Sequence, residues 1–308
     1  MNERTWSVAV LAALALLGVG CSGDSGGGDG DGDSDADADA DSDADADGDC
    51  DPPDAPPDAP ARGSVRVSFP TTGDGSALAQ FSSDDVPPFH QETMREGDCR
   101  LLEYHGEQCQ NCWELCVQGE CRPFPQYVGA GTLTVTGLGS DVRIQDAGGY
   151  YYAVLAGRAL DPGATAGVSA SGGAYPAFEI ATTQPSPIEA DVPNDEITLE
   201  DGTDEEVHWT AVDPCAARVR LTLKSRTAAH GLPPVAMIEC DVPDTGSLTI
   251  PHAIIEAFPE TSHEEICVLV DCPASSLTRY TRATTPAGDS NAELVVESLR
   301  TLYVIHSI

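Results

Sequence analysis

The chain has 308 residues, and 51 aspartates and glutamates against 15 lysines and arginines give a formal net charge of −36. Such an excess of acid argues against nucleic acid or an anionic membrane surface as a partner of the folded part. Aromatic residues make up 6% of the chain, and 30 glycines with 23 prolines indicate many turns, which argues against a helical bundle or coiled coil.

An apolar run over residues 8–19 follows Arg4 near the start of the chain. About 12 residues are too few for a helix across a ~30 Å hydrocarbon core, but they suit the apolar region of a signal peptide. The next residues, Gly18-Val19-Gly20-Cys21, resemble the lipobox of bacterial lipoproteins. The resemblance implies a signal peptide over residues 1–20 and a lipid such as palmitate on Cys21. It also implies an anchor in the cell envelope, at the outer membrane or the cell surface.

Residues 21–61 form an acidic tether rich in Asp, Ala, Gly and Pro, with 15 aspartates in residues 22–61. Like charges repel one another, and the segment has no apolar surface to bury, so it is expected to be disordered and extended. Proline-rich residues 52–60 should stiffen toward polyproline II. Such a tether would hold a folded body away from the membrane.

Residues 43–54 begin with Asp-x-Asp-x-Asp-Gly and resemble the calcium loops of EF-hand, dockerin and thrombospondin type-3 repeats. The resemblance implies hard oxygen ligands for calcium, with Gly48 allowing the bend. Pro52 and Pro53 prevent the helix that should follow an EF-hand loop. An ordered calcium site and diffuse, weak cation binding are therefore both considered, and the candidate ligands are Asp43, Asp45, Asp47, Asp49, Asp51 and Asp54.

The chain has 11 cysteines, and removing the lipid carrier leaves an even number. In an exported protein, ten cysteines predict five disulfide bonds. The stretch 109–121 is dense in cysteine, and structural bridges are favoured there over a zinc site with His105, a thioredoxin-like redox centre or an iron–sulfur cluster. The disulfide candidates are Cys50, Cys99, Cys109, Cys112, Cys116, Cys121, Cys215, Cys240, Cys267 and Cys272.

The last four cysteines are expected to pair among themselves. Cys267 and Cys272 lie in one expected strand, where five residues span about 17 Å, too far for a bridge that needs Cα atoms within ~7 Å. Cys215 and Cys240 should therefore each bind one of them. The five cysteines of residues 99–121 then need one outside partner, and Cys50 is predicted to staple the tether to the folded body. A disulfide dimer through Cys50 is the alternative.

Alternating polar and apolar residues predict many short strands, and Pro, Gly, Asp and Asn separate them. Residues 251–258 predict one helix, with Pro251 at its first turn. The expected strands cover residues 64–69, 132–136, 142–145, 150–155, 166–170, 178–182, 196–199, 206–211, 218–224, 236–240, 247–250, 266–271, 276–281, 292–296 and 302–306.

The fold is therefore predicted to be mainly β, with one or two antiparallel β-sandwich domains of the immunoglobulin or fibronectin type. A proline-rich, polar segment at residues 185–194 suggests a boundary. One β-domain is expected over residues 62–190, with a small disulfide-rich insertion at 99–121. A β-sandwich domain with four cysteines is expected over residues 191–308.

Catalytic motifs are weak. Asp244-Thr245-Gly246 resembles the aspartic-protease signature, which implies paired carboxylates that activate water, but the chain carries one such motif and we interpret it as a hairpin turn. Residues 167–172 nearly form a nucleophile elbow without the surrounding α/β pattern. Tyr150-Tyr151-Tyr152 is either an aromatic platform for sugar or peptide, or a strand with alternate rings on each face.

The sequence favours a lipid-anchored envelope protein with a non-catalytic binding, adhesion or structural role. Its expected partners are the membrane, through the lipid on Cys21, and an envelope or extracellular ligand. No cofactor is expected beyond possible calcium binding in the tether. The alternatives are an exported enzyme of unrecognised class and a calcium-responsive surface protein.

Overall fold

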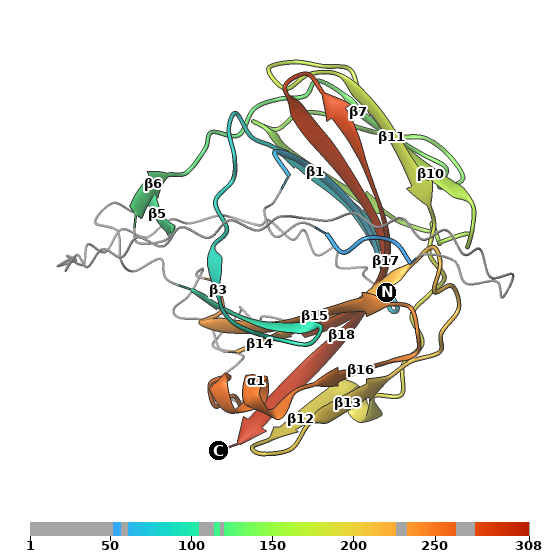
Figure 1. The fold of residues 1–308 in the computed structure, drawn as a ribbon. Helices are drawn as coiled ribbons and strands as arrows, with labels where there is room; N and C mark the ends of the chain where they lie inside the picture. Colours follow the sequence, from blue (N-terminus) through green and yellow to red (C-terminus); the bar gives the residue numbers. More distant parts are fainter. Residues whose placement is uncertain are drawn as a thin grey trace, which may run out of the picture.

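A computed structural model describes residues 52–56, 61–104, 114–117, 120–225, 233–262 and 275–307 (Figure 1). The described chain is mainly β, which confirms the predicted fold class. Its helices are α1 (His252–Ala257) and a 3-10 helix (Pro193–Asp195). The strands are β1 (Gly63–Pro70), β2 (Gly75–Phe81), β3 (His90–Glu96), β4 (Cys99–Tyr104), β5 (Glu114–Val117), β6 (Glu120–Pro123), β7 (Leu133–Thr136), β8 (Val142–Ile144), β9 (Tyr150–Leu155), β10 (Thr165–Ala170), β11 (Phe178–Thr183), β12 (Glu196–Glu200), β13 (Glu205–His208), β14 (Arg218–Lys224), β15 (Ala236–Pro243), β16 (Ser247–Ile250), β17 (Ser275–Ala287) and β18 (Ser290–Ser307).

A ten-stranded sheet forms the centre of the molecule, and nine of its strands follow the order β3-β4-β15-β14-β17-β18-β1-β2-β9. The tenth strand, β12, pairs with residues 303–307 of β18, beyond the part of β18 that pairs with β1. All its pairings are antiparallel except two, because β18 runs parallel to both β1 and β12. A four-stranded sheet, β11-β10-β7-β8, and two-stranded ribbons β13-β16 and β5-β6 complete the described strands.

Two hydrophobic cores lie on the same side of the large sheet. The first core lies between β1, β2 and β9 and the four-stranded sheet. The second core packs β4, β14 and β15 against β12, the β13-β16 ribbon and α1. Figure 1 shows β17 and β18 running from the four-stranded sheet at the top to β12, β13, β16 and α1 at the bottom.

The long strand β18 contributes to both cores. Successive side chains of a strand point to opposite faces, so the even-numbered residues of β18 all face the cores. Leu294 and Val296 enter the first core, and Leu302 and Val304 enter the second. The domain boundary at residue 190 stays a prediction. Residues from both sides of it nevertheless share each core, because β4 packs in the second and β18 in the first.

Polar side chains occupy the waist between the two cores. Ser298 Oγ accepts the backbone N–H of Ile188 at 2.9 Å, and Arg300 donates to the carbonyls of Ala190 and Val192. Arg279 on β17 donates to the Pro187 carbonyl at 2.7 Å. The proline-rich segment around residues 185–194 therefore crosses the waist, tied to β17 and β18 by hydrogen bonds.

Several elements agree with the sequence prediction. Strands β9, β14 and β16 have the predicted bounds, and the predicted helix is α1. The two strands expected over residues 292–306 are one continuous strand, β18. Strand β2 was missed because its buried side chains include the small Ala77 and Ala79, which give little apolar signal. The strand predicted at residues 266–271 lies outside the described residues.

Candidate functional site

Most of the predicted tether and anchor residues lie outside the described chain. These are the lipid carrier Cys21 and the calcium candidates Asp43, Asp45, Asp47, Asp49 and Asp51. Asp54 is described and exposed. Within the described ranges, no group of three or more His, Cys, Asp or Glu is placed to hold a metal ion. A helix long and apolar enough to cross a bilayer is likewise not found among the described residues.

The described disulfide joins Cys99 on β4 to Cys240 on β15, with Cα atoms 4.0 Å apart. The expectation that Cys240 binds Cys267 or Cys272 is therefore wrong. Strands β4 and β15 are neighbours in the sheet, and the two cysteines face each other directly in the register. Sequence proximity had grouped Cys99 with the dense cysteines after it, whereas its partner is 141 residues away. A disulfide of this kind is typical of exported proteins.

The other cysteine predictions stay open. Cys121 and Cys215 are also disulfide-bonded. Cys50, Cys109, Cys112, Cys267 and Cys272 lie outside the described residues, as does the side chain of Cys116. Cys99 is bonded to Cys240, so an even number of cysteines remains in residues 109–121. The argument that an odd cysteine in residues 99–121 needs Cys50 as its partner therefore no longer holds.

Asp244 of the protease-like motif is fully buried at the waist. Its carboxylate accepts the Trp209 indole N–H at 2.7 Å and the backbone N–H groups of Val212 and Asp213 at 3.1 and 3.0 Å. It also forms an ion pair with Arg279, whose Nε lies 3.0 Å from Oδ2. Both side chains are almost completely shielded from solvent, with exposures of 1% for Arg279 and 0% for Asp244.

The hairpin interpretation of this motif is wrong, because β15 pairs with β4 and β14 while β16 pairs with β13. Gly246 has a φ of +104°, which a side-chain-bearing residue rarely adopts, and its carbonyl accepts the Trp209 backbone N–H at 2.9 Å. The carboxylate of Asp244 is occupied by these donors and is shielded from solvent. The motif therefore builds the waist rather than a catalytic site.

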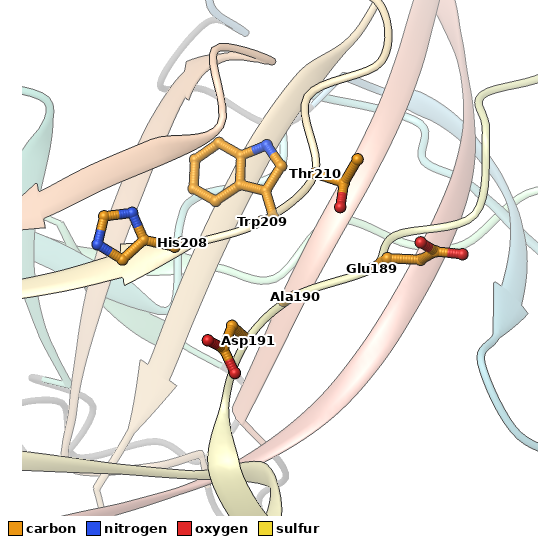
Figure 2. Close-up of a pocket in the computed structure, with 6 residues that line it drawn as sticks. All are labelled: Glu189, Ala190, Asp191, His208, Trp209 and Thr210. Carbon is orange, nitrogen blue, oxygen red and sulfur yellow. The ribbon is translucent and has the colours of Figure 1, made fainter.

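A shallow hollow of about 400 Å³ lies beside the waist. Figure 2 shows the two segments that line it side by side, with the Trp209 indole between His208 and Thr210. Glu189 and Asp191 come from the facing segment, where Thr210 donates its backbone N–H to the Glu189 carbonyl and Asp191 to the His208 carbonyl. His208 lies 3.5 Å from Glu206, and both are well exposed, so the pair is expected to contribute little.

The side of the large sheet opposite the two cores carries mostly polar groups, and we call it the polar face. Backbone pairing sets its side chains in rows across the strands. One row crosses six strands, from β9 at the sheet edge to β14, and consists of Val154, Ser76, Ser68, Glu297, Tyr280 and Arg218.

Asp241 on β15 organises the part of the polar face over β14, β15 and β17. Its carboxylate accepts from Arg218 Nε at 2.5 Å, from Arg220 Nε at 2.8 Å and from the Tyr280 hydroxyl at 2.7 Å. The Arg220 guanidinium also lies 5.0 Å from the centre of the Tyr280 ring, a cation–π geometry. Burial and the neighbouring Asp241 carboxylate raise the pKa of Tyr280 well above its ordinary value, so its hydroxyl remains a donor.

Further arginine–carboxylate pairs extend across the same face. Arg66 lies 3.2 Å from Glu297, Arg282 pairs with Glu293, and Arg100 lies 2.7 Å from Glu239. Arg100 also lies 3.6 Å from Glu92, which pairs with Arg95 at 2.5 Å. Six arginines and Lys224 thus meet five carboxylates on the described polar face, in a chain whose net charge is −36. Burial and the nearby Arg66 lower the pKa of Lys224. The face is suited to attract acidic groups.

One end of the polar face carries an exposed strip on edge strand β9. Tyr150, Tyr152 and Val154 are 40%, 55% and 53% exposed. Tyr151 points the opposite way, into the first core, where its hydroxyl donates to the Gly131 carbonyl at 2.9 Å and accepts the Ala130 N–H. The three tyrosines therefore alternate as a strand requires, and two rings remain free for contact. We call Tyr150, Tyr152 and Val154 the tyrosine strip.

No protein-family model and no curated protein matches the chain. Among solved structures, it is similar to an ICAM-5 D1–D4 ectodomain fragment at 15% identity and a TM-score of 0.15. The match covers 75% of this chain and 61% of that fragment. A TM-score of 0.15 is too low to indicate a shared fold or function.

Proposed function

We propose that the chain is a lipid-anchored protein of the bacterial envelope that binds carbohydrate without catalysis, through the tyrosine strip. The observation that carries this proposal is the pair of exposed rings, Tyr150 and Tyr152, on one side of a strand fixed from behind by the buried Tyr151. The lipobox-like residues before Cys21 support the anchor.

The surroundings of the strip suit a sugar. Tyrosine offers an apolar ring face and a hydroxyl, and a pyranose offers an apolar C–H face and several hydroxyls. Gln80 and Ser76 face Tyr150 and Val154 across the β2–β9 pair, on the same side of the sheet. Stacking and hydrogen bonding are therefore available side by side, and the rings lose little rotamer freedom on binding.

A glycan array probed with the full chain tests the proposal, with Cys21→Ser included to keep the protein soluble. Tyr150→Ala with Tyr152→Ala should weaken binding roughly tenfold or more, since two aromatic contacts are lost. The melting temperature should not change, because both rings are exposed. Tyr303→Ala, which removes an exposed ring on β18 rather than on β9, is the matched control and should bind as the wild type does.

Two results would contradict the proposal. One is a double variant that binds the same glycans with unchanged affinity. The other is a chain that binds no glycan but captures an extended peptide through the same tyrosines, which would make the strip a peptide site.

An exported enzyme is the alternative, and the hollow beside Trp209 is the place for it. Glu189, Asp191 and His208 supply carboxylate and imidazole groups there, all exposed. A hydrolytic activity that disappears in Asp191→Asn and His208→Gln, but not in Tyr152→Ala, would favour the enzyme. The calcium-responsive alternative concerns residues outside the described chain.

A further inference from the structure

The end of the tether contacts the polar face. Residues 52–56, with the sequence Pro-Pro-Asp-Ala-Pro, are described, and the Pro53 carbonyl accepts a hydrogen bond from Arg218 Nη1 at 2.7 Å. Pro53 and Asp54 form one wall of a hollow of about 190 Å³, whose other walls come from Ala216, Arg218 and the Tyr280–Thr284 stretch of β17. The tether is thus in contact with the body ten residues before β1 begins.

Arg218 is built to hold this carbonyl. The residue is 8% exposed, and two of its three nitrogens are taken by Asp241: Nε by the carboxylate at 2.5 Å and Nη2 by the backbone carbonyl at 3.0 Å. These bonds fix the planar guanidinium, so Nη1 is directed at Pro53 without further loss of side-chain freedom. Asp241 is itself held by Arg220 and Tyr280.

The chemistry of the segment fits the groove. A proline-rich chain favours the polyproline II conformation, which leaves its carbonyls without internal partners and available to a donor. Aromatic-lined grooves recognise such segments because little conformational entropy is lost on binding. Asp54 adds a negative charge beside a face on which arginines and Lys224 outnumber the carboxylates, which favours an acidic proline-rich ligand over a neutral one.

We propose that the groove of Arg218, Tyr280 and Ala216 is a binding site for acidic proline-rich segments, and that residues 52–56 of the same chain occupy it. We call this contact the tether clamp. It is independent of the proposed carbohydrate binding, since the tyrosine strip lies on β9, five strands away from Arg218 on β14. The clamp fixes Pro53 on the body. Together with the predicted staple at Cys50 it leaves residues 22–49 as the spacer, with a maximum reach of about 90 Å.

The sequence provides a control within the tether. Residues 56–60 repeat the motif Pro-Pro-Asp-Ala-Pro, so Asp54 and Asp58 lie in the same local sequence. An endoproteinase that cuts on the amino side of aspartate can cleave the Pro53–Asp54 and Pro57–Asp58 bonds, which have the same local sequence. In the proposal only the first of these bonds lies in the tether clamp. The experiment compares their cleavage rates in the full chain carrying Cys21→Ser, under single-cut conditions, by mass spectrometry of the body fragments.

The wild type should be cut at Asp54 roughly tenfold more slowly than at Asp58, as expected for a hydrogen bond from a charged donor. Arg218→Gln should bring the two rates within about twofold of each other. Arg220→Gln is the matched control, because Arg220 lies on the same strand and face and contacts Asp241 but not Pro53. It should keep most of the protection.

A tether variant covers the case in which Arg218→Gln fails to fold. Pro52→Ser with Pro53→Ser leaves the body unchanged and removes the polyproline stiffness, so protection at Asp54 should be lost. Equal cleavage of the two bonds in the wild type overturns the proposal. So does protection of Asp54 that persists in the tether variant, or in a folded Arg218→Gln.

Discussion

Replacing Asp244 by alanine removes the anion from the buried pair at the waist. Breaking a buried ion pair by deleting one partner costs about 3–5 kcal/mol, because the remaining charge is left without compensation. The Arg279 side chain is 1% exposed and cannot turn toward water. The Trp209 indole N–H loses its acceptor as well, which adds about 1 kcal/mol or more when the group stays buried. We therefore expect the free energy of unfolding to fall by roughly 4–6 kcal/mol.

Urea unfolding followed by tryptophan fluorescence and far-ultraviolet circular dichroism measures this loss. Because domains are stable by only about 5–15 kcal/mol, Asp244→Ala could leave too little folded protein for a transition. Asp244→Asn keeps an acceptor for Trp209 and should lose less. Adding Arg279→Met to Asp244→Asn removes the unpaired cation and should restore part of the stability.

The exposed pair Arg62–Asp85 is the control, since both groups reach water. Asp85→Asn should leave the unfolding midpoint unchanged within error. A loss below about 1 kcal/mol in Asp244→Ala would refute the reasoning, because it would mean that Arg279 finds water or another anion at the waist.

Three further predictions concern the anchor, the disulfides and a histidine. Cys21→Ser should move the protein from the membrane pellet to the soluble fraction and abolish labelling by a clickable fatty acid; labelling that persists contradicts the lipobox interpretation. A non-reduced peptide map should contain the Cys99–Cys240 link. It should also join Cys50 to the body, and Cys215, which is disulfide-bonded, is the expected partner. The reason is the contact of Arg218 with Pro53, because Arg218 follows Cys215 by three residues and Pro53 follows Cys50 by three residues. A free thiol at Cys50 would exclude the staple. The hydrogen bond between the His252 ring and Asp204, 2.8 Å long, raises the pKa of His252 above its ordinary value. The backbone N–H of His252, which donates to the Asp204 carboxylate at 2.7 Å, and the same ring contact lower the pKa of Asp204. The His252 contribution to stability is therefore full below its unfolded pKa and lost as pH rises through the raised folded value, whereas the Asp204 contribution is lost as pH falls through the lowered one. A nuclear magnetic resonance titration should show the raised His252 value, and Asp204→Asn should return it to normal.

Local patterns predicted the strands well where alternation was strong. Arg218–Lys224 places Val219, Leu221 and Leu223 in the second core and the intervening polar residues on the polar face. The helix α1 also followed from its local sequence. Pairing between distant segments was not predictable in the same way. The parallel contact of β1 with β18 joins residues more than 200 positions apart, and no local pattern specifies it.

The candidate sites show the same division. Alternation in Tyr150-Tyr151-Tyr152 already indicated that one ring would point away from the other two. The burial of Asp244 could not be predicted, because its partners Trp209 and Arg279 lie 35 residues away in each direction and the local sequence reads as a turn. The pairing of Cys99 with Cys240 was not predicted for the same reason, since proximity in the sequence favours other partners for both cysteines.

The arrangement of the polar face relates the tether clamp to the tyrosine strip. The row from Val154 through Glu297 and Tyr280 to Arg218 crosses six strands. Five spacings of about 4.8 Å separate its ends by about 24 Å. A tether held at Arg218 therefore leaves the body from β14, five strands away from β9 in the sheet. If the lipid anchors the far end of that tether, tension on it pulls on the Arg218 end, and the tyrosine strip is turned outward from the membrane. A tether fixed only at β1 would attach in the middle of the same row and would set no such direction.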